Sequence, residues 1–253
     1  ARPADLVLVE TPSNPLLRIT DIAAVADLAH CAGALLAVDN TLSTPLLQRP
    51  LALGADLVVH STTKLVAGHS DVIGGACLAR DEAVADELAG WANTLGLTAA
   101  AFDSYLVMRG LRSLDARLRV HAENALAVAH ALEAHPAVRA VHFPALPQHP
   151  DHALAARQMA GPGSLIAFEV DGGLAGVEAF LDGLEIFHLA ESLGGVESLV
   201  CHPATMTHAA MSPEALAAAG VGDGLLRLSV GLERDADLVA AVREGLDRVS
   251  TRC

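Results

Sequence analysis

The sequence has little positive charge and few aromatic residues. Its 253 residues include 16 lysines and arginines against 30 aspartates and glutamates, which gives a formal net charge of −14. A protein of this charge repels a phosphate backbone, and no cluster of basic residues offsets the average. The composition therefore argues against nucleic acid as a partner.

Long hydrophobic runs are also missing. Apolar stretches such as 32–38 end well short of the roughly 20 residues that a membrane-spanning helix needs, so we predict no contact with a membrane. The four cysteines lie far apart, at positions 31, 77, 201 and 253, without the spacing or density of a disulfide framework. We therefore expect reduced thiols and a cytoplasmic protein. The chain runs into its first apolar segment without an initiator Met or a basic n-region, which we interpret as truncation.

Motifs for metal and nucleotide sites are absent as well. The 12 histidines form neither HExxH nor a Cys/His ligand set. Neither GxGxxG nor GxxxxGK followed by Ser or Thr occurs. We therefore predict no metal, no dinucleotide site and no Walker-type phosphate loop.

Apolar segments that end abruptly in polar residues recur along the first part of the chain. Residues 6–10, 34–39 and 57–61 lack the alternation of half-buried strands, as strands that are buried on both faces do. Residues 73–79 form a fourth candidate, and an amphipathic segment that ends near Gly33 connects the first two. This strand, crossover, strand order predicts an α/β fold with a mostly parallel sheet.

The chain after residue 80 alternates helical segments with shorter strands. We predict helices at 81–93, 99–109, 113–134, 152–159, 175–182, 213–219 and 235–248, and strands at 138–143, 164–170, 196–201 and 225–230. This pattern indicates a second, smaller α/β domain. We place the boundary between residues 122 and 123, so that the domains are 1–122 and 123–253.

In an open parallel sheet, ligands bind beyond the carboxyl ends of the strands. Asp39 and Lys64 follow two of the predicted strands, and hydroxyl residues directly precede the lysine. A lysine amine can form an imine with pyridoxal phosphate, which also needs a carboxylate for its pyridine nitrogen and hydroxyls for its phosphate. Taken singly, an Asp or a Lys after a strand is commonly a solvated loop residue, so these residues alone leave both interpretations open.

Seven longer segments carry a more specific signal. They are ETPSNPLLRITDI (10–22), AVDNT (37–41), GADLVVHSTTK (54–64), GHSDVIGG (68–75), AFDSYLVMRGLRSL (101–114), LAESLGGVESL (189–199) and LLRLSVGLE (225–233). In sequence and order they resemble the Cys/Met-metabolism (trans-sulfuration) family of fold-type I pyridoxal-phosphate enzymes. The resemblance covers essentially the whole chain. It implies a large domain with a mostly parallel sheet, truncated at its N-terminus, and a smaller α/β C-terminal domain.

The resemblance implies roles for nine residues. Lys64 is expected to bind pyridoxal phosphate as a Schiff base and to move protons on the substrate, and Asp39 to pair with the pyridine nitrogen. Ser61 and Thr63 are expected at the phosphate, with Thr41 close to the ring. The residues expected to bind the substrate are Asn14, Glu191, the backbone of Ser192, and Arg227, which would bind the α-carboxylate.

Within the family, the segments are most similar to those of the bacterial γ-synthase members. The implied reaction joins O-succinylhomoserine or O-acetylhomoserine with L-cysteine to give cystathionine, in a homotetramer built from dimers. Cystathionine γ-lyase and homoserine sulfhydrylase activities remain alternatives because those members share nearly all of these motifs. An alternative of another class is a non-catalytic remnant, in which Lys64 would pair with Asp39.

Some positions depart from the family pattern. Leu65, Val66 and Ala67 follow the lysine where an aromatic residue and Asn-Gly are usual, and Leu42 replaces a Phe. Family members also have about a third more chain at the N-terminus, which supplies further groups for the phosphate and the ring. We therefore expect that residues 1–253 alone bind the cofactor weakly and are incomplete as a catalyst.

Overall fold

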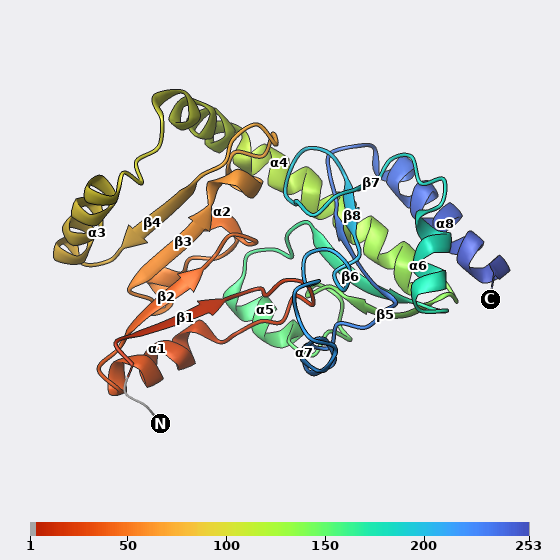
Figure 1. Cartoon of the computed structure of the whole chain (residues 1–253), viewed down its shortest axis with the longest axis horizontal. Helices are drawn as coiled ribbons and strands as arrows, with labels where there is room; N and C mark the ends of the chain where they lie inside the picture. The colour runs from red at the N-terminus through yellow and green to blue at the C-terminus, as the bar shows by residue number, and fades with distance from the viewer. Residues whose placement is uncertain (1–3, 253) are drawn as a thin grey trace.

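The computed structural model describes residues 4–252, which form two β-sheets connected by one long helix (Figure 1). The first sheet contains, in spatial order, β1 (Leu6–Glu10), β2 (Leu35–Asp39), β3 (Leu57–Ser61) and β4 (Gly75–Ala79). β1, β2 and β3 are parallel, and β4 is antiparallel to β3. The predicted α/β fold with a mostly parallel first sheet is confirmed.

One face of the first sheet is covered by helix α1 (Ile22–Cys31). The side chain of Asp21 caps this helix by accepting a hydrogen bond from the backbone N–H of Ala24 at 3.1 Å. The buried side of α1 packs against Leu36 and Val38 of β2. Figure 1 shows β1 to β3 pointing toward the second sheet, so the polar residues at their carboxyl ends lie between the two sheets.

The second sheet is mainly antiparallel. Its spatial order is β5 (Val138–His142), β6 (Leu165–Val170), β9 (Leu225–Ser229), β8 (Leu199–Cys201) and β7 (His188–Leu189). Only the β7–β8 pair is parallel. Helices α6 (Leu174–Leu181) and α8 (Asp235–Arg252) pack against it, and the rings of Phe168 and Phe180 meet edge to face with their centroids 5.3 Å apart. The two-residue strand β7 is too short to be predicted from periodicity.

The remaining helical segments are short apart from α3. They are α2 (Thr44–Leu47), the 3-10 turn η1 (Pro50–Leu53), the π-type turn η2 (Thr62–Val66), α3 (Glu82–Leu95), α5 (His152–Gln158) and α7 (Pro213–Ala219). The turn η2 carries Lys64.

The sequence-based prediction of two helices at 99–109 and 113–134 is wrong, because α4 is one 33-residue helix, Ala101–Glu133. Gly110 lies in the predicted gap and lowers helix propensity by about 1 kcal/mol relative to Ala. Tertiary contact outweighs this cost: a Cβ atom at Gly110 would lie 2.7 Å from Cα of Ala67. The predicted domain boundary between residues 122 and 123 falls within α4 and stays a prediction.

Within residues 4–252, no helix is both long and apolar enough to cross a lipid bilayer. Over the same range, no group of three or more His, Cys, Asp or Glu side chains is arranged to hold a metal ion. Cys31, Cys77 and Cys201 are free thiols, so no disulfide connects these three.

A buried chain of amide side chains joins the two halves of the molecule. Gln48, which is 1% exposed, donates hydrogen bonds to the carbonyl of Thr11 at 2.9 Å and to Oδ1 of Asn40 at 2.8 Å. Gln158 of α5 donates to Oε1 of Gln48 at 2.9 Å. Because Asn40 follows Asp39 directly, this chain fixes the carboxyl end of β2 relative to α5.

We predict that Gln48→Leu destabilises the protein by about 2–5 kcal/mol, because it leaves two buried acceptors unpaired and removes one of the two acceptors of Gln158 Nε2. Urea unfolding measures the change as a lower midpoint with an unchanged slope. Gln148→Leu is the matched control, since Gln148 is exposed and a surface change of this kind typically stays within about 0.5 kcal/mol. Equal losses in the two variants would contradict the role assigned to the amide chain.

Candidate functional site

Three of the predicted site residues form one hydrogen-bonded group at the strand ends. Asp39 Oδ1 accepts the backbone N–H of Thr41 at 2.9 Å. Thr41 Oγ1 accepts the backbone N–H of Ser61 at 2.8 Å. Thr41 therefore ties the carboxylate after β2 to the hydroxyl residue at the end of β3.

A second carboxylate lies beside Asp39. Glu10 ends β1 and is the register partner of Asp39 in the neighbouring strand. The pKa of Glu10 is raised, mainly because the carboxylate is partly buried and also because the negative charge of Asp39 lies nearby. A hydrogen bond from the backbone N–H of Asn14, at 3.2 Å, offsets part of this rise. Two acids at one sheet edge favour a cationic group, such as a protonated ring nitrogen, over an anion.

Lys64 lies in η2, directly after β3. Its backbone angles, φ −91° and ψ −135°, are not helical, so the chain bends at the lysine itself. Its Nζ donates a hydrogen bond to Ser192 Oγ at 3.2 Å. Burial lowers the pKa of Lys64, and the positive charge of Arg227 lowers it further. Lys64 is also the only lysine in the sequence.

Arg227 on β9 connects three segments of the site. It is 2% exposed, and its Nη1 donates to Oδ1 of Asn14 at 2.8 Å. Its Nη2 donates to the backbone carbonyls of Glu191 at 2.7 Å and Ser192 at 3.0 Å. Nε of Arg227 is buried and finds no hydrogen-bond partner among the described residues. A guanidinium stays protonated in proteins, and the hydrogen-bond partners of Arg227 are all neutral. Its positive charge can therefore attract a carboxylate ligand.

Two predicted residues make contacts other than those expected of them. Thr63 Oγ1 accepts the backbone N–H of Gly74 at 3.0 Å and donates to its carbonyl at 3.3 Å, so it holds the loop before β4. Glu191 is exposed, and its backbone carbonyl rather than its carboxylate binds Arg227. The roles expected of the Thr63 hydroxyl at a phosphate and of the Glu191 carboxylate at a substrate stay predictions.

Sequence reasoning missed two residues that shape the site. Arg117 of α4 binds the backbone carbonyls of Leu65 and Val66, which follow Lys64. Gly194 has a φ of +76°, and a Cβ atom there would lie 2.8 Å from the backbone nitrogen of Leu65. The available signals were weak: an arginine on an otherwise apolar stripe of a helix, and one glycine of a Gly-Gly pair.

The residues present fit the ring end of pyridoxal phosphate. Lys64 offers an amine of lowered pKa, and Asp39 offers a carboxylate that the backbone N–H of Thr41 holds in place. The buried Arg227 carries a positive charge that would suit a carboxylate. Ser61 and Thr63 bring hydroxyl groups but no charge to a phosphate.

Comparison with known proteins agrees with this donor set. Residues 1–247 match the family described as Cys/Met metabolism PLP-dependent enzyme. A cystathionine gamma-synthase of Escherichia coli (strain K12) is 54% identical over 240 residues, which are 95% of this chain and 62% of that protein. A cystathionine gamma-lyase of Dictyostelium discoideum is 46% identical over 243 residues, which are 96% of this chain and 63% of that protein.

A solved structure shows the same fold. The crystal structure of cystathionine gamma synthase from Xanthomonas oryzae pv. oryzae, in complex with aminoacrylate and cysteine, matches with a TM-score of 0.97 and 60% identity, over 98% of this chain and 64% of that chain. The chain thus spans 62% to 64% of the length of these three proteins. The extent of these matches shows that the chain belongs to the Cys/Met-metabolism family of pyridoxal-phosphate-dependent enzymes.

Proposed function

We propose that the chain provides the lysine and the substrate-carboxylate site of a γ-replacement enzyme that makes cystathionine from O-succinylhomoserine or O-acetylhomoserine and L-cysteine. One observation carries the proposal, namely the position of the only lysine. Ser192 binds Lys64 through its hydroxyl and the buried Arg227 through its carbonyl. Lys64 also follows β3, the strand that pairs with the one ending in Asp39. The relatives described as synthases, at 54% and 60% identity, support synthesis more strongly than the lyase at 46%.

Each residue of the site has one task toward the cofactor. When bound, pyridoxal phosphate supplies an aldehyde that bonds to amines and a ring that accepts electrons from the substrate. Lys64 would hold it by its amine, and Asp39 would keep its pyridine nitrogen protonated. Thr41, which is hydrogen-bonded to both Asp39 and Ser61, sets the spacing between the carboxylate and the hydroxyl residue that would meet the phosphate.

Arg227 orients the substrate. Its guanidinium is buried and charged, so a substrate carboxylate gains a charge-assisted hydrogen bond there. Asn14 and the carbonyl of Ser192 hold the guanidinium in place. Because the hydroxyl of the same Ser192 binds Lys64, a substrate held by Arg227 presents its α-carbon near the lysine amine.

Lys64 moves the protons of the reaction. Its lowered pKa leaves more neutral amine at neutral pH than an exposed lysine has. With cofactor and substrate bound, the Lys64 amine would remove the proton on Cα and, after releasing that proton, would help to remove one on Cβ. A correctly placed general base of this kind typically contributes about 10²–10⁴-fold to the rate.

Cleavage of cystathionine is a second candidate, which the γ-lyase relative supports. The same residues would act in that cleavage. A homoserine sulfhydrylase would differ from the synthase in the sulfur nucleophile that adds to the substrate. A non-catalytic remnant predicts a contact between Lys64 and Asp39, so the contact between Lys64 and Ser192 supports the catalytic candidates.

The assembly and the location also belong to the proposal. We expect a homotetramer built from dimers, in the cytoplasm, acting on small amino-acid substrates. Several large apolar side chains of α3 and α4 are exposed, namely Trp91, Phe102, Tyr105 and Met108. Exposed apolar patches of this kind are typical of surfaces that another chain segment or subunit covers.

We predict that pyridoxal phosphate attaches to Lys64 alone among the side chains. After incubation with the cofactor and reduction with borohydride, peptide mass spectrometry should find the phosphopyridoxyl group on the Lys64 peptide. Lys64→Arg keeps the positive charge but should lose this label, and the N-terminal amine is the internal control. Labelling of the N-terminal amine with none on Lys64 would contradict the assignment.

We predict a higher kcat/KM for O-succinylhomoserine plus cysteine than for cystathionine alone. Because the chain spans 62% of the Escherichia coli relative, the assay uses a hybrid in which the uncovered part of that relative completes the chain. Lys64→Ala should abolish both reactions because the proton-transferring amine is gone. A strong preference for cystathionine would select the lyase candidate instead.

We predict that Arg227→Met raises the pKa of Lys64 toward its ordinary value of 10.5, because a nearby positive charge is removed. Protein labelled with 13C at the ε-carbon of lysine gives one NMR signal for this titration, since Lys64 is the only lysine. In the wild type, the free energy of unfolding should increase as the pH rises from the lowered pKa of Lys64 to 10.5. Over that range the unfolded chain binds more protons than the folded chain. Arg234→Met, at an exposed arginine, is the control, and a Lys64 pKa equal in both variants would refute the coupling.

A further inference from the structure

Helix α4 contacts the turn that carries Lys64 through a buried arginine with no place in the proposed reaction. Arg117 donates from Nη1 to the carbonyl of Leu65 at 2.8 Å and from Nη2 to the carbonyl of Val66 at 3.3 Å. Nη2 also donates to the carbonyl of Gly110, one of its own helix, at 2.8 Å. Burial lowers the pKa of Arg117, yet a guanidinium stays protonated in proteins. A buried charge therefore binds the two carbonyls that follow Lys64.

The face of α4 that meets the turn is built around this arginine. Gly110, Ser113 and Arg117 are spaced three and four residues apart, so they share one side of the helix. Ser113 Oγ accepts from Arg117 Nε at 3.0 Å and donates to the carbonyl of Gly110 at 3.1 Å. The arginine side chain thus runs back toward the N-terminus of α4, the usual direction for long helical side chains. Each of the three guanidinium nitrogens has an acceptor.

Two glycines allow the turn, the helix and the arginine to come together. A Cβ atom at Gly110 would lie 2.7 Å from the carbonyl oxygen of Val66. Gly68 has a φ of +74°, and a Cβ atom there would overlap the guanidinium of Arg117. A side chain at Gly110 would collide with the backbone of the Lys64 turn, and one at Gly68 would displace the guanidinium of Arg117.

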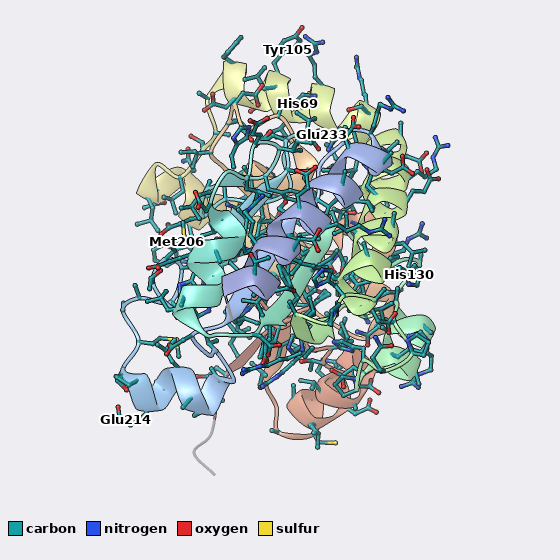
Figure 2. All side chains as sticks on the ribbon, turned by 90° about the vertical axis from the view of Figure 1, so that its right-hand side faces the viewer. His69, Tyr105, His130, Met206, Glu214 and Glu233 are labelled. Atoms are coloured by element: carbon teal, nitrogen blue, oxygen red, sulfur yellow. The ribbon has the colours of Figure 1, made fainter. Side chains whose placement is uncertain are left out.

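The same helix also holds the strand that bears Arg227. His121 Nδ1 lies 2.7 Å from the carbonyl of Val230, and Asn124 donates to the carbonyl of Gly231 at 3.0 Å. Figure 2 shows α4 between Tyr105 and His130, with His69, which follows the Lys64 turn, and Glu233, which follows β9, both drawn toward the Tyr105 end. One rigid helix thus fixes the Lys64 turn relative to the end of β9.

We propose that Arg117 is a positioning residue for Lys64: by binding the carbonyls of Leu65 and Val66, it holds the turn against α4 and so sets where the lysine amine lies relative to Arg227. The inference rests on the proposed function of Lys64. The carbonyls at the end of a helical turn have no partner within it. Arg117 supplies that partner, at a point where the backbone bends at the lysine.

The test compares Arg117→Gln with Arg119→Gln. Arg119 lies two residues further along α4, its side chain is 70% exposed, and it pairs with Asp115 at 3.2 Å, so its replacement is a matched control. The readouts are the pH titration of the single 13C-labelled Lys64 signal and, in the hybrid enzyme, kcat and KM. Ser113→Ala removes the acceptor of Arg117 Nε and the donor to the Gly110 carbonyl but leaves the contacts of Arg117 with Leu65 and Val66. It is a milder variant for the case in which Arg117→Gln does not fold.

Arg117→Gln should move the Lys64 titration toward the ordinary lysine value, because the amine becomes more solvated. It should lower kcat by on the order of 10²-fold, the loss that a misplacement of about 1 Å can cause, with KM little changed. Ser113→Ala should change both in the same direction by less, and Arg119→Gln should match the wild type.

If Arg117→Gln and Ser113→Ala lower only the stability and leave both readouts at the Arg119→Gln values, Arg117 merely stabilises the fold and the inference is overturned. Failure of the proposed function would look different. In that case Lys64 takes no phosphopyridoxyl label in the wild type, while its titration still reports whether Arg117 positions it.

Discussion

The guanidinium of Arg227 joins three segments that are far apart in the sequence. It binds Asn14 after β1 and the carbonyls of Glu191 and Ser192 before β8, while it sits on β9 itself. Burying this charge with neutral acceptors costs solvation free energy that carbonyl and amide oxygens only partly return. The charge also lowers the pKa of the nearby Lys64. The basicity of the lysine and, in the proposed function, the binding of the substrate therefore depend on one side chain.

The long helix α4 makes this arrangement rigid. It holds the Lys64 turn through Arg117, and it holds the end of β9 through His121 and Asn124. A single unbroken helix transmits position better than two helices with a joint, which gives the continuity through Gly110 a functional reason. The hydrogen-bonded amides of Gln48 and Gln158 fix the position of the carboxyl end of β2 in the same way. Side chains from both sheets thus converge on the site.

The parts of the molecule with strong local signals were predictable. Apolar segments that end in polar residues identified β1 to β3 and placed Asp39 and Lys64 at one sheet edge. The expectation that all three strands are buried on both faces is wrong for β1, because its Leu6 and Leu8 are exposed. The motif around Arg227 suggested a carboxylate site, but its contacts with Asn14 and Ser192 span more than 30 residues and leave no periodic trace. The unbroken α4 was missed because its glycine weakens the local propensity, and the compensating contact with Ala67 lies more than 40 residues away. Contacts between residues far apart in the sequence could not be predicted from its pattern.

The division of work between arginine and lysine follows from their chemistry. Of the 16 basic residues Lys64 is the only lysine, which leaves 15 arginines. A guanidinium stays protonated and presents several donors in one plane, so Arg117 and Arg227 can each bind several carbonyl or amide oxygens at once. An amine is a compact charge whose pKa shifts readily on burial, and its neutral form bonds to a carbonyl carbon. Within these 253 residues an aldehyde cofactor meets a single side-chain amine, and the arginines around it can hold structure and charge without competing for it.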